Sequence, residues 1–192
     1  PPQLSLHSAD GERIVWLVEN RIDGGHPYSV FFNAHRTPDF GQLIGPEGQE
    51  LRYRITKPAD FDPDTRYPVL LHVYGGPTSQ LVTDRWGRRT LIEQYFARQG
   101  YVVFALDNRG VERQGKAFQD AAYLKLGQIE IVDQMVGVNW LREQSFIDPD
   151  RIGIFGWSYG GYLALMAPAQ HPGLFAAAVA VAPVTDWTLY DT

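Results

Sequence analysis

The pattern of hydrophobic and polar positions divides the chain near residue 50. Before that point, β-branched and aromatic runs at 14–18 and 28–32 flank a loop with Asp23-Gly24-Gly25, which predicts two antiparallel strands. A third run at 51–55 alternates apolar and charged residues with period two, as a half-buried strand does. Glycine and proline at 41–48 mark the boundary between the two parts.

After the boundary, short apolar runs alternate with helical patterns. The runs are typical of strands buried on both faces of a parallel sheet, and they lie at 69–73, 101–106, 151–155 and 176–182. The helices are expected at 88–99, 128–144 and 160–170, the second with Ile129, Val132, Val136 and Trp140 on its buried face. This order predicts an α/β fold: a mostly parallel sheet with helices on both faces, joined by right-handed crossovers.

Composition excludes several classes of function. The chain has 192 residues, of which 44% are hydrophobic and 20% charged, as in ordinary globular proteins. Its net charge of −5 predicts no surface for nucleic acid or for an anionic membrane. No apolar stretch reaches the roughly 18 residues of a membrane span, and the absence of cysteine excludes disulfides and thiol chemistry. No metal is implied, and no nucleotide cofactor either, because the pairs Gly75-Gly76 and Gly160-Gly161 lack the spacing of a phosphate loop.

The ends of the sequence predict a longer polypeptide. Pro1-Pro2-Gln3 contains neither an initiating methionine nor the apolar core of a signal peptide, and 187–192 carries no helix stop. We therefore expect both ends to be internal cuts. The cellular compartment stays open.

The segment Gly156-Trp157-Ser158-Tyr159-Gly160 matches G-x-S-x-G, the nucleophile elbow of α/β-hydrolases. A predicted strand precedes it and a predicted helix follows, as that motif requires. The strained turn brings the flanking backbone so close together that only glycine fits on either side of the serine. The alternative is a structural serine in a glycine-rich turn.

A serine nucleophile needs donors for the oxyanion of its adduct. The backbone N–H of Tyr159 is one such donor by the geometry of the elbow. The loop Tyr74-Gly75-Gly76-Pro77, after the strand at 69–73, is expected to supply the other, with the phenol of Tyr74 as the donor. The alternative for Tyr74 is a packed aromatic residue in a turn.

The general base is not evident in the chain. In α/β-hydrolases an aspartate and then a histidine follow the serine. Here His171 is the only histidine after Ser158, and Asp186 and Asp191 have none after them. His171 is expected to cap the helix at 160–170. The chain alone is therefore expected to be nearly inert.

Four motifs together resemble the prolyl oligopeptidase family, most closely its dipeptidyl peptidase IV-like members of bacterial type. They are Val73-Tyr74-Gly75-Gly76-Pro77, Asp107-Asn108-Arg109-Gly110, Gly156 to Gly161 and Ala182-Pro183-Val184-Thr185-Asp186-Trp187. The resemblance covers about residues 45–192. It implies that residues 1–48 are the C-terminal strands of a β-propeller and that 49–192 are the N-terminal part of an α/β-hydrolase catalytic domain.

The resemblance also implies a function. Such enzymes remove X-Pro or, less efficiently, X-Ala dipeptides from peptides with a free N-terminus, through an acyl-enzyme. The family's catalytic positions fall on Ser158, Tyr74 and Tyr159, and its proline pocket falls on Val184, Trp187 and Tyr190. From the residues alone, the last three are equally well explained as core residues. The resemblance further implies a homodimer for the full-length protein, in the periplasm or cytoplasm of a bacterium.

Two other classes of function stay open. One is another serine hydrolase of the same fold, such as an acylaminoacyl peptidase, a prolyl oligopeptidase or a carboxylesterase. The other is a binding module that has the hydrolase fold without its chemistry. The intact serine and glycines of the motif argue against the second.

Overall fold

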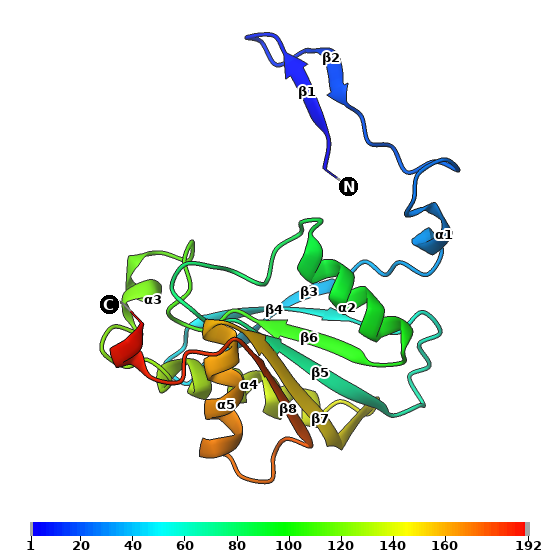
Figure 1. Cartoon of the computed structure of the whole chain (residues 1–192). Coiled ribbons are helices and arrows are strands. Elements are labelled where there is room, and N and C mark those ends of the chain that lie inside the picture. Colours follow the sequence, from blue (N-terminus) through cyan, green and yellow to red (C-terminus); the bar gives the residue numbers. More distant parts are fainter. Residues whose placement is uncertain (1, 191–192) are drawn as a thin grey trace.

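The computed structural model describes residues 2–190, without the side chains of residues 88 and 89. It contains a six-stranded sheet and a separate two-stranded hairpin (Figure 1). The strands are β1 Leu4–His7, β2 Arg13–Val18, β3 Asp39–Ile44, β4 Glu50–Thr56, β5 Tyr67–Val73, β6 Val102–Leu106, β7 Ile147–Trp157 and β8 Ala177–Val181. The helices are α1 Ser29–Phe32, α2 Arg88–Arg98, α3 Lys116–Asp120, α4 Ile129–Arg142 and α5 Tyr159–Gln170, with a 3₁₀ turn, η1, at Trp187–Leu189.

The large sheet has the strand order β3-β4-β6-β5-β7-β8. Strands β6, β5, β7 and β8 are parallel, whereas β3 and β4 run antiparallel to their neighbours. The chain thus crosses from β5 to β6 on one side and returns through α4 to β7 on the other. This arrangement confirms the predicted α/β-hydrolase fold.

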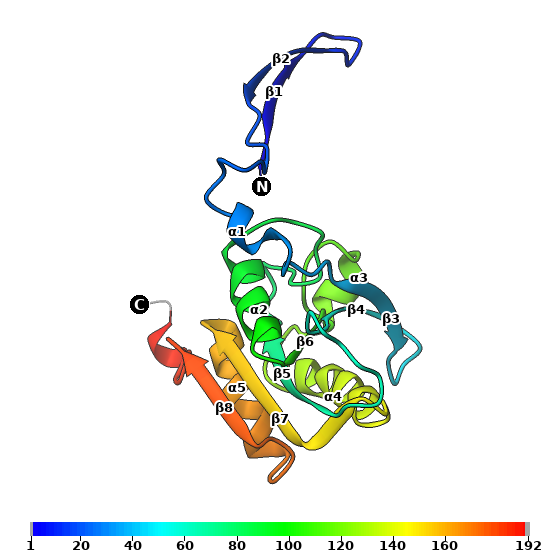
Figure 2. The ribbon, with the colours of Figure 1, turned by 90° about the vertical axis from the view of Figure 1, so that its right-hand side faces the viewer.

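Adjacent residues of β4 show how the sheet is covered. The ring of Tyr53 lies 4.8 Å from that of Trp140 in α4, and the guanidinium of Arg54 donates a 2.6 Å hydrogen bond to Glu93 in α2. Successive residues of a strand point to opposite faces. Helix α2 therefore covers one face, while α4 and α5 cover the other (Figures 1 and 2).

The expected strand at 28–32 is wrong: residues 29–32 form the short helix α1, and β2 pairs with β1 instead. Tertiary contacts explain the difference. The ring of Tyr28 lies 4.7 Å from that of Trp86, and its hydroxyl lies 2.8 Å from Nδ1 of His35. Such contacts override the β-propensity of an aromatic run.

Strand β3 pairs with β4 along its length, from Asp39 opposite Ile55 to Ile44 opposite Glu50. The six-stranded sheet therefore begins inside the segment that the sequence pattern assigned to the first domain. The hairpin β1–β2 stands clear of this sheet in both views (Figures 1 and 2).

The predicted buried face of α4 is confirmed only in part: Val136 and Trp140 pack against the core, whereas Val132 does not. Val132 is 48% exposed, and the residues buried under this helix include three polar ones, Glu130, Asp133 and Gln134. Each of the three has a polar partner in the sheet, its loops or α5, as described below. Hydrophobic periodicity cannot detect a helix face that is buried through such pairs. No helix among residues 2–190 has the length and apolarity needed to cross a membrane.

Candidate active site

Ser158 lies in a sharp turn between β7, which ends at Trp157, and α5, which begins at Tyr159. Its backbone has φ 57° and ψ −119°, a conformation that is strained for any residue except glycine. A serine before a helix usually caps it, but the Ser158 side chain makes no capping hydrogen bond. Ser158 is half-buried, and its side chain is held on a strained turn without capping the helix.

The two glycines of the motif are required by close backbone contacts. A Cβ at Gly156 would overlap the backbone of Gly160, which is the close approach expected from the sequence. A Cβ at Gly160 would overlap the end of β5, lying 2.9 Å from Cα of Tyr74. The second glycine thus allows the serine turn to pack against the strand that leads into the Tyr74 loop.

The loop after β5 lies directly against the serine turn. Gly75 has φ +69°, and a Cβ at Gly76 would lie 2.9 Å from Cγ of Tyr159. The side chain of Asn108 donates a 3.1 Å hydrogen bond to the carbonyl of Gly75, and Gln134 of α4 in turn donates to Asn108 at 2.9 Å. The position of the loop is therefore fixed from β6 and α4, through residues to which the sequence assigned no role.

Most of the residues expected in the site form one aromatic cluster. The ring centroid of Tyr159 lies 6.4 Å from that of Tyr74 and 5.6 Å from that of Trp187, which is 5.3 Å from Tyr190. Tyr162 joins the cluster, 5.3 Å from Trp187. Val184 is half-buried on the segment between β8 and η1 and makes none of these ring contacts.

That segment crosses the first turn of α5. A Cβ at Gly161 would lie 3.1 Å from Cα of Pro183. The second glycine of the pair Gly160-Gly161 thus lets the chain before η1 approach the helix, which places Trp187 beside Tyr159. The arrangement is a cluster of aromatic rings next to the serine turn.

The phenol of Tyr159 donates a short hydrogen bond to the carboxylate of Glu130 in α4. Both side chains are buried, and Glu130 is 0% exposed. Burial raises the pKa of Glu130, and burial together with the nearby Glu130 raises the pKa of the Tyr159 phenol. Sequence reasoning missed Glu130, because an acidic residue in the first helical turn ordinarily reads as a solvated one.

Two histidines of the chain, His171 and His72, lie away from Ser158. His171 caps the C-terminus of α5, as expected, whereas Ser158 precedes its N-terminus. A helix of this length separates the two residues by about 18 Å. His72 of β5 is buried on the α2 side, where its Nδ1 lies 2.7 Å from Oε1 of Glu93.

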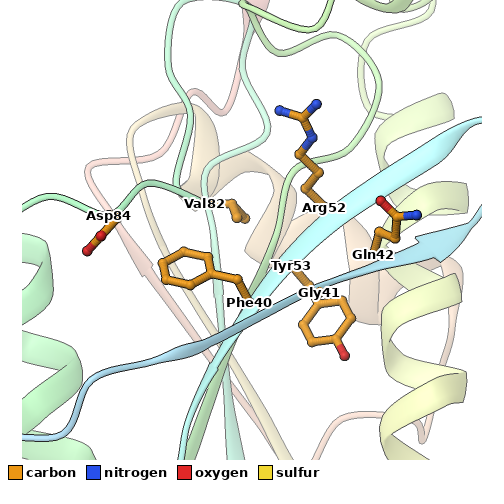
Figure 3. A pocket seen from close by; sticks show the side chains of 7 residues that line it. All are labelled: Phe40, Gly41, Gln42, Arg52, Tyr53, Val82 and Asp84. Atoms are coloured by element: carbon orange, nitrogen blue, oxygen red, sulfur yellow. The ribbon is translucent and has the colours of Figure 1, made fainter.

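A pocket of about 540 Å³ lies elsewhere, over β3 and β4 (Figure 3). Phe40, Arg52 and Asp84 line it together with Gln42, Val82 and backbone near Tyr53. Its lining contains no serine, threonine, cysteine or histidine. Asp84 supplies the only carboxylate of this lining, and the pocket does not include Ser158.

A serine on a strand-to-helix elbow, on a sheet of this order, defines an α/β-hydrolase. Residues 88–192 match the model of the prolyl oligopeptidase family. The chain belongs to the prolyl oligopeptidase family.

Individual relatives are similar over most of this chain. Dipeptidyl peptidase 8 of mouse is 46% identical over 81% of this chain and 18% of its own length. Mouse prolyl endopeptidase FAP is 43% identical over 74% of this chain and 19% of its own length. The structure of dipeptidyl peptidase 4 from Porphyromonas gingivalis matches with a TM-score of 0.89 and 36% identity, over 100% of this chain and 27% of that one. The chain thus spans about a fifth to a quarter of the length of these relatives.

Proposed function

We propose that this chain carries the nucleophile, the oxyanion donors and the proline pocket of a serine exopeptidase that releases X-Pro and X-Ala dipeptides. The observation that carries the proposal is the strained backbone of Ser158 beside the cluster of Tyr74, Tyr159 and Trp187. The relatives support it, because two of them are dipeptidyl peptidases.

In this mechanism, Oγ of Ser158 attacks the carbonyl carbon of the second substrate residue. The backbone N–H of Tyr159 and the phenol of Tyr74 donate to the oxyanion that forms. The C–N bond then breaks, the shortened peptide leaves as an amine, and water hydrolyses the acyl-enzyme to free the dipeptide. The proline ring lies among Val184, Trp187 and Tyr190.

The proton of Ser158 must pass to a base that residues 2–190 do not place near it. We propose that an aspartate and a histidine outside these 192 residues complete the triad. The polypeptide that includes them is called the complete enzyme below. We also propose that the segment 1–48 contains the end of a β-propeller, because the hairpin β1–β2 within it stands clear of the sheet and exposes Leu4, Ile14 and Leu17.

The test compares the complete enzyme, its Ser158→Ala variant and the 192-residue chain. The complete enzyme is expected to cleave Ala-Pro and Gly-Pro chromogenic amides and to react with a fluorophosphonate probe, and Ser158→Ala should abolish both. The chain alone is expected to show at most the small residual rate that an oxyanion site supplies. Equal labelling of wild type and Ser158→Ala would overturn the proposal.

An endopeptidase is the second candidate, because one relative is named a prolyl endopeptidase. Substrates with a blocked N-terminus separate the two. A dipeptidyl peptidase should reject N-acetyl-Ala-Pro amides that an endopeptidase would cleave.

A further inference from the structure

Glu130 is the second residue of α4 and lies fully buried behind the aromatic cluster. One carboxylate oxygen accepts the hydrogen bond of the Tyr159 phenol. The other, Oε2, is buried and has no hydrogen-bond partner among the described residues. Backbone N–H groups at the start of α4 favour the charged form of this carboxyl group, but burial outweighs them and raises its pKa. Burying Glu130 therefore costs folding free energy, and its contribution is better sought in Tyr159, the residue that it holds.

Tyr159 connects the two halves of the candidate site. Its backbone N–H is the proposed oxyanion donor, and its ring lies against Gly76 of the Tyr74 loop and 5.6 Å from Trp187. A tilt of this ring would therefore change its contacts with both the loop and Trp187. The backbone fixes one end of the side chain, and Glu130 binds the other.

We infer that Glu130 is a positioning residue that sets proline selectivity by holding the Tyr159 ring as a wall of the pocket. The inference rests on the proposed function. Glu130 does not touch substrate, and its effect passes entirely through Tyr159. A proline ring needs the wall in place, whereas an alanine methyl group leaves the pocket largely unfilled in either case.

The test measures kcat and KM of the complete enzyme on Ala-Pro and Ala-Ala amides. Glu130→Leu keeps a similar volume but removes the acceptor, and should lower kcat/KM for Ala-Pro about 10- to 100-fold. The loss for Ala-Ala should be several-fold smaller, so the Pro/Ala selectivity falls. Glu130→Gln keeps an acceptor for the phenol and should retain selectivity within about threefold of wild type.

Tyr159→Phe removes the other partner and should reproduce the selectivity loss. Because both changes break the same hydrogen bond, the double variant should lose no more than Glu130→Leu alone. Tyr67→Phe is the matched control: this buried tyrosine begins β5, and its hydroxyl accepts a 2.8 Å hydrogen bond from the N–H of Asp62. It should leave both kcat/KM values unchanged even if it lowers Tm.

Two results would overturn the inference while the proposed function stands: unchanged selectivity in Tyr159→Phe, or losses that multiply in the double variant. Tyr159→Phe and Glu130→Gln keep the test decisive if Glu130→Leu does not fold. Absence of Ser158-dependent hydrolysis in the wild-type complete enzyme would instead overturn the proposed function, and the inference with it.

Discussion

The glycines of β7 and α5 differ in what surrounds them. A Cβ at Gly156 would overlap backbone atoms of Gly160, which cannot move without unwinding the first turn of α5. A Cβ at Gly153, on the same strand, would have its nearest neighbour at 3.7 Å, an ordinary contact. The same residue type is thus indispensable at one position and replaceable at another.

Gly156→Ala is therefore expected to lower the free energy of unfolding by at least about 1–3 kcal/mol, the usual cost of overpacking. Gly153→Ala should change it by much less. Urea denaturation of the 192-residue chain, followed by circular dichroism, measures both. Equal midpoints for the two variants would contradict the overlap argument.

Asp107, just after β6, is a second residue whose surroundings determine its chemistry. Its carboxylate accepts hydrogen bonds from the N–H groups of Leu81 and Val82. Burial nevertheless dominates and raises the pKa of Asp107 to about 6. The folded state therefore binds a proton that the unfolded state has already released between about pH 4 and pH 6.

Stability linked to a raised carboxyl pKa is present at low pH and falls as pH rises through that window. Relative to Asp107→Asn, the wild-type chain should thus lose roughly 2–3 kcal/mol of unfolding free energy between pH 4 and pH 7. Denaturant titrations of both proteins across this range measure the difference. A difference that is constant with pH would show that the Asp107 pKa is not raised.

At the scale of elements, α4 is attached to the rest of the fold through buried polar pairs. Asp133 is 0% exposed and accepts hydrogen bonds from Nε of Arg109 at 2.9 Å and from its terminal nitrogen at 2.8 Å. It also accepts the backbone N–H of Arg109 at 2.8 Å. These bonds fix the loop after β6. Asn108 lies in this loop and donates a hydrogen bond to the carbonyl of Gly75, so the position of the Tyr74 loop also depends on them.

Asp133→Ala would leave the buried guanidinium of Arg109 with only the exposed Glu47 as an ionic partner. We expect the free energy of unfolding to fall by about 3 kcal/mol. This is the lower end of the usual range for breaking a buried ion pair, because Glu47 still interacts with Arg109. Asp120→Ala breaks the exposed ion pair with Lys116 and should leave the free energy of unfolding almost unchanged. Thermal unfolding of both variants tests this, and similar Tm values would contradict it.

These pairs explain which parts of the structure could be predicted from the sequence. The alternation of apolar runs and helices, and the strand and helix around Ser158, follow from local periodicity, and the sheet confirms them. The buried face of α4 follows from periodicity only in part, because Glu130 and Asp133 are buried although they are charged, while the apolar Val132 is exposed. Helix α1 was missed for a related reason: contacts of Tyr28 with distant residues decide its conformation.

At the scale of the whole molecule, one edge of the six-stranded sheet is formed by β8. Strand β8 is an edge strand made of alanine and valine, and Val179 on it is 52% exposed. A groove of about 420 Å³ lies beside it, lined by Val179, Phe155 and Phe96 among other apolar residues. An unpaired strand next to exposed apolar surface is a template for pairing with another chain.

The 192-residue chain is therefore expected to associate through β8 as its concentration rises, and Val179→Lys should oppose this, because a charged edge residue disfavours strand pairing. Val132→Lys is a matched control, since Val132 is similarly exposed, at 48%, but lies on α4 away from an open strand. Light scattering coupled to size-exclusion chromatography measures the mass of each protein. Association that persists in Val179→Lys at the wild-type level would place the contact on another surface, such as the exposed apolar residues of the hairpin β1–β2.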